Sequence, residues 1–130
     1  MNAPYIPQNH QQVIPYLILR QPTKFLLFTK EVFDAKELDI IYHEDKTTIM
    51  HAEIMIGDSV IMFASTTEQY AEQVAGLFIY VDDADARFEK ALAHGARSIK
   101  EPSDECYGRS SGILDPCGNT WWITKAEPPS

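Results

Sequence analysis

Hydrophobic residues in the first half of the chain occur either in unbroken runs or at helical spacing. Residues 13–20, VIPYLILR, form an apolar run with β-branched side chains, which is typical of a strand. Residues 23–33 instead space their apolar side chains as a helix does, and Pro22 suits the first turn of that helix. Further strands are expected at residues 36–43, 47–57 and 59–65, and Gly57-Asp58 predicts a hairpin between the last two.

The same order begins again in the second half of the chain. Residues 76–83 predict a strand whose final acidic residues can cap a helix. Residues 84–95 predict that helix, and Gly95 is placed to end it. The expected strands that complete this half lie at residues 96–101, 110–116 and 119–125. The chain therefore predicts one strand–helix–strand–strand–strand unit, present twice.

The two copies can be placed in register with each other. Ile14 corresponds to Gly76, 62 positions later, and Met62 corresponds to Trp122, 60 positions later. These near-equal offsets predict one domain at residues 1–130, with modules at 13–66 and 74–125 and a polar connector between them. Neither module can bury both faces of its own sheet, so we expect the two sheets to meet around a shared cleft.

Composition agrees with a single globular domain and excludes several classes of protein. The 130 residues are 45% hydrophobic and 23% charged. No apolar run approaches the roughly 18 to 20 residues of a membrane span, and the start, MNAPYIPQNHQQ, is not a signal-peptide pattern but predicts a loosely ordered arm. A net charge of −8 argues against binding to nucleic acid. Cys106 and Cys117 are expected to be thiols in the cytoplasm.

Four segments resemble a known superfamily. They are IPYLIL, MHAEIMIGDSVIMFA, GLFIYVDDADARFEKALAHGA and CYGRSSGILDPCGNTWWIT. They are similar to the vicinal oxygen chelate (glyoxalase/bleomycin resistance/dioxygenase) superfamily, and in particular to its PhnB-like branch. The resemblance implies an α+β fold, in which two βαβββ modules form a curved, cleft-containing mixed β-sheet with the helices outside. It also implies a homodimer.

The resemblance also locates the positions of a metal site. Metal-dependent members of the superfamily direct four His, Glu or Gln side chains into the cleft, and these positions fall at Ile14, Met62, Gly76 and Trp122. None of the four supplies a nitrogen or oxygen donor that suits a divalent ion. We therefore expect no metal, no cofactor and an apolar cleft. Trp122, Met62 and Ile14 become candidate ligand-binding residues, although a buried Trp122 is more often part of a core.

Three polar residues are further candidates. Alternation places Ile49, His51, Glu53 and Met55 on one face of their strand and Met50 on the core face. His51 then lies in a pocket wall, in a subunit interface or on an ordinary surface. Tyr107 and Arg109 lie in a predicted loop, where Arg109 either clamps an anionic group or pairs with Asp115.

The remaining polar residues favour structural roles. Asn119 is expected to be a turn residue. His10, His43 and His94 are each expected at the surface.

Three functions remain open from the sequence. The first is a metal-free protein that binds a hydrophobic or planar small molecule in the cleft between modules, for sequestration, resistance or metabolite carriage. The second is an enzyme: a metal-dependent lyase, isomerase or dioxygenase with displaced ligands, or one that uses Arg109, Tyr107 and His51 for acid–base chemistry. The third is a structural dimer with a filled cleft. The sequence favours the first, and whether the protein is an enzyme stays uncertain.

Overall fold

The computed structural model describes residues 3–127 and contains two modules of the same order. The first comprises β1 (Tyr16–Leu19), α1 (Pro22–Phe33), β2 (Lys36–Tyr42), β3 (Ile49–Ile56) and β4 (Ser59–Ser65). The second comprises β5 (Gly76–Tyr80), α2 (Ala84–Ala93), β6 (Arg97–Glu105), β7 (Gly108–Leu114) and β8 (Thr120–Ala126). The expected fold class, α+β with two βαβββ modules, is confirmed.

Each module forms its own four-stranded mixed sheet. The first sheet has the order β1-β4-β3-β2 and the second has the equivalent order β5-β8-β7-β6. The first and last strands of each module pair in parallel, with Tyr16 opposite Met62 and Phe78 opposite Trp122. These matching pairs agree with the offsets of 62 and 60 found in the sequence.

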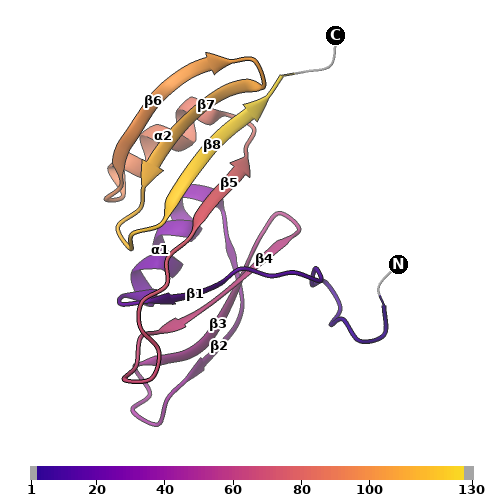
Figure 1. The fold of residues 1–130 in the computed structure, drawn as a ribbon, viewed down its shortest axis with the longest axis vertical. Helices are drawn as coiled ribbons and strands as arrows, with labels where there is room; N and C mark the ends of the chain where they lie inside the picture. The colour runs from indigo at the N-terminus through magenta and orange to yellow at the C-terminus, as the bar shows by residue number, and fades with distance from the viewer. Residues whose placement is uncertain (1–2, 128–130) are drawn as a thin grey trace.

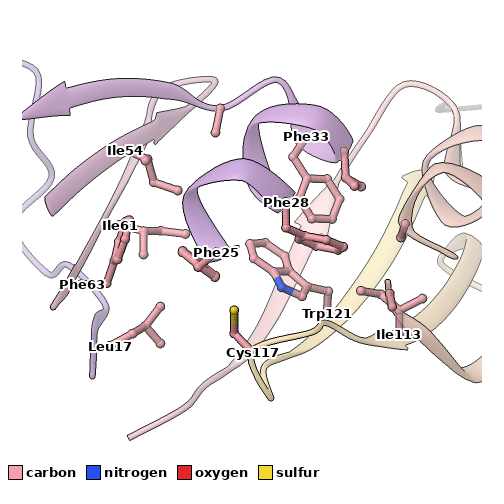
Figure 2. Close-up of a cluster of buried hydrophobic side chains, with 14 of the residues drawn as sticks. Leu17, Phe25, Phe28, Phe33, Ile54, Ile61, Phe63, Ile113, Cys117 and Trp121 are labelled. Carbon is pink, nitrogen blue, oxygen red and sulfur yellow. The ribbon is translucent and has the colours of Figure 1, made fainter. Parts of the chain in front are cut away.

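Both helices lie on the same side of the two sheets (Figure 1), and the core lies in this layer. Trp121, on β8, packs against Phe25 and Phe33 of α1, with ring centroids 6.3 and 4.6 Å apart (Figure 2). Since α1 belongs to the first module and β8 to the second, this contact joins the modules into one core. Trp121 and Trp122 alternate across the sheet as predicted, with Trp121 2% exposed and Trp122 37% exposed.

Local signals in the sequence account for most ends of the helices. α1 begins at Pro22 and ends at Asp34, which has a left-handed φ of 58°. The side chain of Asp83 caps α2 by accepting a hydrogen bond from the backbone of Ala86. Arg87 of α2 donates to the carbonyl of Val32 and pairs with Asp34, so one side chain ties the second helix to the end of the first.

Two predictions about the strands are wrong. β3 contains a bulge, because Ile41 pairs with His51 and Tyr42 pairs with Ile49, which leaves Met50 as an extra residue. Ile49 consequently turns into the core, and Met50 is 46% exposed on the opposite face. The predicted loop at residues 107–109 is also shorter, because β7 already begins at Gly108.

The sheet faces opposite the helices are here called the open faces. They carry the exposed aromatic residues of the sheets, among them Tyr16 on the first sheet and Phe78, Tyr80 and Trp122 on the second. Neither helix within residues 3–127 is long and apolar enough to cross a membrane.

Candidate functional site

A cavity with a volume of about 780 Å³ lies on the open face of the first sheet. Its floor consists of Tyr16 and Ile18 from β1, Ala64 from β4 and Met50 from β3. The bulge in β3 is what places Met50 in this floor, because regular alternation would have turned that side chain into the core. This floor of aliphatic and aromatic side chains suits an apolar ligand. Polar residues make up much of the remaining lining: His43, Ser65, Thr67, Glu68, Gln69 and Gln73.

The connector between the modules forms the other wall of this cavity. Gln73 and Ile18 exchange backbone hydrogen bonds of 2.9 and 3.0 Å, so the connector is held against the edge of β1. The hydroxyl of Thr67 accepts hydrogen bonds from the backbone of Gln69 and Tyr70, which shapes the loop. The sequence predicted only a polar connector here, and the side chains of Gln69, Tyr70 and Gln73 line the cavity.

A chain of hydrogen bonds runs across the open face next to the cavity. The hydroxyl of Tyr16 lies 3.2 Å from Nδ1 of His51, and Nε2 of His51 lies 2.8 Å from Oε2 of Glu53. Nε2 of His10 lies 2.8 Å from Oε1 of the same carboxylate. Burial acts to raise the pKa of Glu53, but the hydrogen bonds from His10 and His51 outweigh it and the net shift is downward. Glu53 is thus a carboxylate held between two imidazoles.

His10 is not the surface residue that the sequence predicted. Its side chain is only 16% exposed, and its second ring nitrogen, Nδ1, lies 2.9 Å from the carbonyl of Gln8. The hydrogen bonds to Glu53 and Gln8 raise the pKa of His10. Next to it, the side-chain amide of Gln11 bonds both the N–H and the carbonyl of Val60. The N-terminal arm is therefore anchored to the first sheet.

Arg109 lies on the helix side of the second sheet. Its guanidinium pairs with Asp85 of α2 at 3.0 Å and with Asp104 of β6 at 3.3 Å. The sequence allowed Arg109 to pair with Asp115 as one of two alternatives, and this alternative is wrong. Arg109 directly precedes Ser110, which faces the open side, and adjacent residues of a strand point to opposite faces.

Tyr107 lies in the turn between β6 and β7 and is 49% exposed. Its ring is 6.4 Å from that of Phe78, and Phe78 is 5.2 Å from Tyr80. Trp122 lies close to this group, because β5 and β8 pair with Phe78 opposite Trp122. We call Phe78, Tyr80, Tyr107 and Trp122 the aromatic patch of the second sheet.

The residues at the four positions of the superfamily's metal site do not fit a divalent ion. Met62 and Trp122 lie on the open faces of different sheets, and Gly76 pairs with Thr120 at the start of β5. Ile14 precedes β1 and is half-buried. A thioether, an indole, a sec-butyl group and a hydrogen atom offer no oxygen or imidazole donor. Met62 and Trp122 are not among the residues that line the cavity on the first sheet, and their role in ligand binding stays a prediction.

Asn119 and Asp115 support the second module from within. Oδ1 of Asn119 accepts from the backbone of Ala75 in the connector, and its side-chain N–H donates to Asp115. Asn119 is fully buried. Through these hydrogen bonds it connects the β7–β8 turn, of which it is part, to the connector. Across that turn Gly118 donates to the carbonyl of Asp115.

The duplicated βαβββ fold and its open sheet faces can be compared with known proteins. Residues 13–123 match the family described as Glyoxalase/Bleomycin resistance protein/Dioxygenase superfamily. The chain belongs to this superfamily. The match covers nearly the whole chain, so the resemblance inferred from the four segments is confirmed.

Individual relatives show how far the similarity extends. Uncharacterized protein Rv0887c of Mycobacterium tuberculosis is 25% identical, over 93% of this chain and 85% of that protein. The structure of the PhnB protein of Bacillus cereus has a TM-score of 0.69 at 15% identity, covering 89% of this chain and 100% of the other. TnmS3, described as an antibiotic binding protein of Streptomyces sp. CB03234, has a TM-score of 0.70 at 16% identity, covering 91% and 100%. At these identities the two structures show the fold alone.

Proposed function

We propose that this member of the superfamily binds a hydrophobic or planar small molecule in the cavity on the open face of the first sheet, without a metal ion. The observation that carries the proposal is the cavity itself. Its volume of about 780 Å³ is in the range of small-molecule sites. Its floor of Tyr16, Ile18, Met50 and Ala64 gives a mainly apolar surface.

Two further observations support the proposal. The four positions that carry metal ligands in metal-dependent relatives hold Ile14, Met62, Gly76 and Trp122, and without an ion there is no comparable Lewis acid for the substrate oxygens. TnmS3 has the same fold and is described as an antibiotic binding protein. Sequestration of a toxic compound and carriage of a metabolite both require only a cavity of this kind.

Filling the cavity tests the proposal directly. N-phenylnaphthylamine, a neutral fluorescent probe, should bind the wild-type protein, and Ala64→Phe should abolish binding because the added ring occupies the floor. Ala93→Phe is the matched control, since Ala93 is exposed on α2, on the helix side of the molecule. Equal binding by both variants would place the probe elsewhere and overturn the proposal.

We also propose that the protein is a homodimer in which a second copy covers the aromatic patch of the second sheet. Phe78 is 51% and Tyr80 68% exposed, although each is a large apolar side chain. Contiguous exposed aromatic groups are typical of interfaces, where their burial contributes most of the binding energy. A second acidic chain can approach here because the four members of the patch carry no charge.

Sedimentation velocity at micromolar concentration tests the dimer. Phe78→Glu should give monomers, because it places a charge within the patch. Leu27→Glu is the control, since Leu27 is a comparably exposed apolar residue on α1. A wild-type protein that sediments as a monomer would overturn this part of the proposal.

A further inference from the structure

The hydrogen-bond chain beside the cavity fixes the proton positions of its members. A carboxylate only accepts hydrogen bonds, so His10 and His51 must each donate to Glu53 through Nε2. The other nitrogen of His10 faces the carbonyl of Gln8, which also only accepts. His10 therefore carries protons on both nitrogens and forms a charged pair with Glu53, in agreement with its raised pKa.

His51 differs from His10 because its second partner is a hydroxyl. Nδ1 of His51 faces the hydroxyl of Tyr16, which can donate as well as accept. Since Nε2 of His51 donates to Glu53, its Nδ1 carries a proton only in the doubly protonated form of the ring. In the neutral imidazole the proton lies on Nε2 and Nδ1 is an acceptor. The hydroxyl of Tyr16 then donates to His51, and only its oxygen lone pairs remain free.

Tyr16 connects this chain to the cavity. Tyr16 is 47% exposed and lines the cavity beside Ile18. The side-chain amides of Gln69 and Gln73 also line the cavity, but an amide both donates and accepts and so does not discriminate between ligands. Two other polar residues of the lining also have a set direction of hydrogen bonding: the hydroxyl of Thr67 accepts from the backbone of Gln69 and Tyr70, and the carboxylate of Glu68 only accepts. Tyr16 differs from them because His51 takes the proton of its hydroxyl.

We propose that Tyr16 is a specificity residue that offers a hydrogen-bond acceptor to the ligand, and that the protein therefore selects planar apolar molecules carrying a hydroxyl or N–H group. His51 is the positioning residue, because it takes the proton of Tyr16. This inference rests on the proposed function, since it requires that the cavity binds ligands.

Matched probes test the inference. β-Naphthol has a hydroxyl donor that its methyl ether lacks, while both share the same planar ring system. At neutral pH the wild-type protein should bind the naphthol more tightly, and Tyr16→Phe should weaken naphthol binding by about three- to tenfold, the range expected for one hydrogen bond. The affinity for the methyl ether should be unchanged in Tyr16→Phe. Tyr70→Phe removes a second hydroxyl from the cavity lining and should change both affinities in parallel.

A second variant separates positioning from a structural role. In His51→Leu the hydroxyl of Tyr16 has lost its acceptor and becomes free to donate. Naphthaldehyde, which accepts but does not donate, should then gain affinity relative to naphthol, and circular dichroism should show an unchanged fold. A structural role alone would change the affinities for both probes together.

The possible outcomes distinguish the two proposals. If naphthol and its ether bind wild-type protein equally, the selectivity inference is overturned while the cavity remains a binding site. If no probe binds, the proposed function fails and the inference fails with it.

Discussion

The indole Nε1–H of Trp121 donates a hydrogen bond of 2.8 Å to Oδ2 of Asp115, a carboxylate that is only 3% exposed. The same carboxylate accepts from the side chain of Asn119 and from the backbone N–H groups of Cys117 and Asn119. Asp115 thus joins the β7–β8 turn to the tryptophan that packs beneath α1. A buried acceptor with four donors is costly to remove, because each donor would lose its partner.

Asp115→Asn should therefore destabilise the protein by about 2–4 kcal/mol, since the new amide N–H₂ meets the donors of Asn119 or Trp121. Chemical denaturation measures the change. Asp58→Asn, at the exposed β3–β4 turn, is the control and should change the stability by less than about 0.5 kcal/mol. Similar values for the two variants would contradict the structural role of Asp115.

The pair of His10 and Glu53 should make the anchoring of the N-terminal arm depend on pH. The pKa of His10 is raised from 6.5 in the folded state, so its contribution is complete below about pH 6.5 and is lost as the pH rises through the folded value. The pKa of Glu53 is lowered from 4.5, so its contribution is present above about pH 4.5 and is lost as the pH falls through the folded value. Both contributions are present together at weakly acidic pH.

The measurement is the stability difference between wild type and His10→Ala as a function of pH. Asp39, opposite Glu53 on β2, and His51 are the other titratable groups that face this carboxylate. The same comparison in a Glu53→Gln background removes the interaction and should flatten the profile. A profile that is unchanged in that background would show that His10 acts without Glu53.

The ring of Trp122 lies against Gly112, its neighbour on β7. A Cβ atom on Gly112 would stand 2.5 Å from Cζ3 of the indole. Gly112→Ala should displace this ring, which is 37% exposed, so we expect a stability change of less than about 1 kcal/mol but a red shift of the Trp122 emission. Fluorescence of Gly112→Ala in a Trp122→Phe background is the control, because the remaining Trp121 should not respond.

The two cysteines should differ in reactivity. Cys106 is exposed, whereas burial raises the pKa of the Cys117 thiol to about 12. The thiolate is the reactive form, so Cys117 should be labelled by iodoacetamide far more slowly than Cys106 at neutral pH. Peptide mass spectrometry after timed labelling measures both rates. The urea-unfolded protein is the control, in which both cysteines should be labelled at similar rates. Equal labelling rates of Cys106 and Cys117 in the native protein would show that Cys117 is accessible.

Much of the fold could be predicted because its signals are local. The spacing of Phe25, Phe28 and Val32 determines a helix whatever lies around it, and Asp83 is placed to cap the next helix. The alternation of Trp121 and Trp122 followed from strand geometry alone. Alternation failed at Ile49 and Met50, because a bulge depends on the pairing with β2, which a single strand does not reveal.

The candidate site was less predictable, because its members come together only through long-range contacts. His51 is a candidate from the sequence, but its partner Tyr16 in β1 lies 35 residues away. Glu53, which His51 contacts, also binds His10 of the arm, which is 43 residues from Glu53. Arg109 was assigned to a loop, and its partner Asp85 is 24 residues distant on a helix. No periodicity in the sequence marks such pairs.

By itself, the sequence determined the duplication and the order of the elements, since both depend on residue type and spacing. The tertiary structure alone decided that the connector and Met50 form a cavity with Tyr16, and that His10 and His51 share the carboxylate of Glu53. The reason is physical: the closure of a cavity and the direction of a hydrogen bond depend on contacts between residues far apart in the sequence, such as Gln73 with Ile18 and His10 with Glu53.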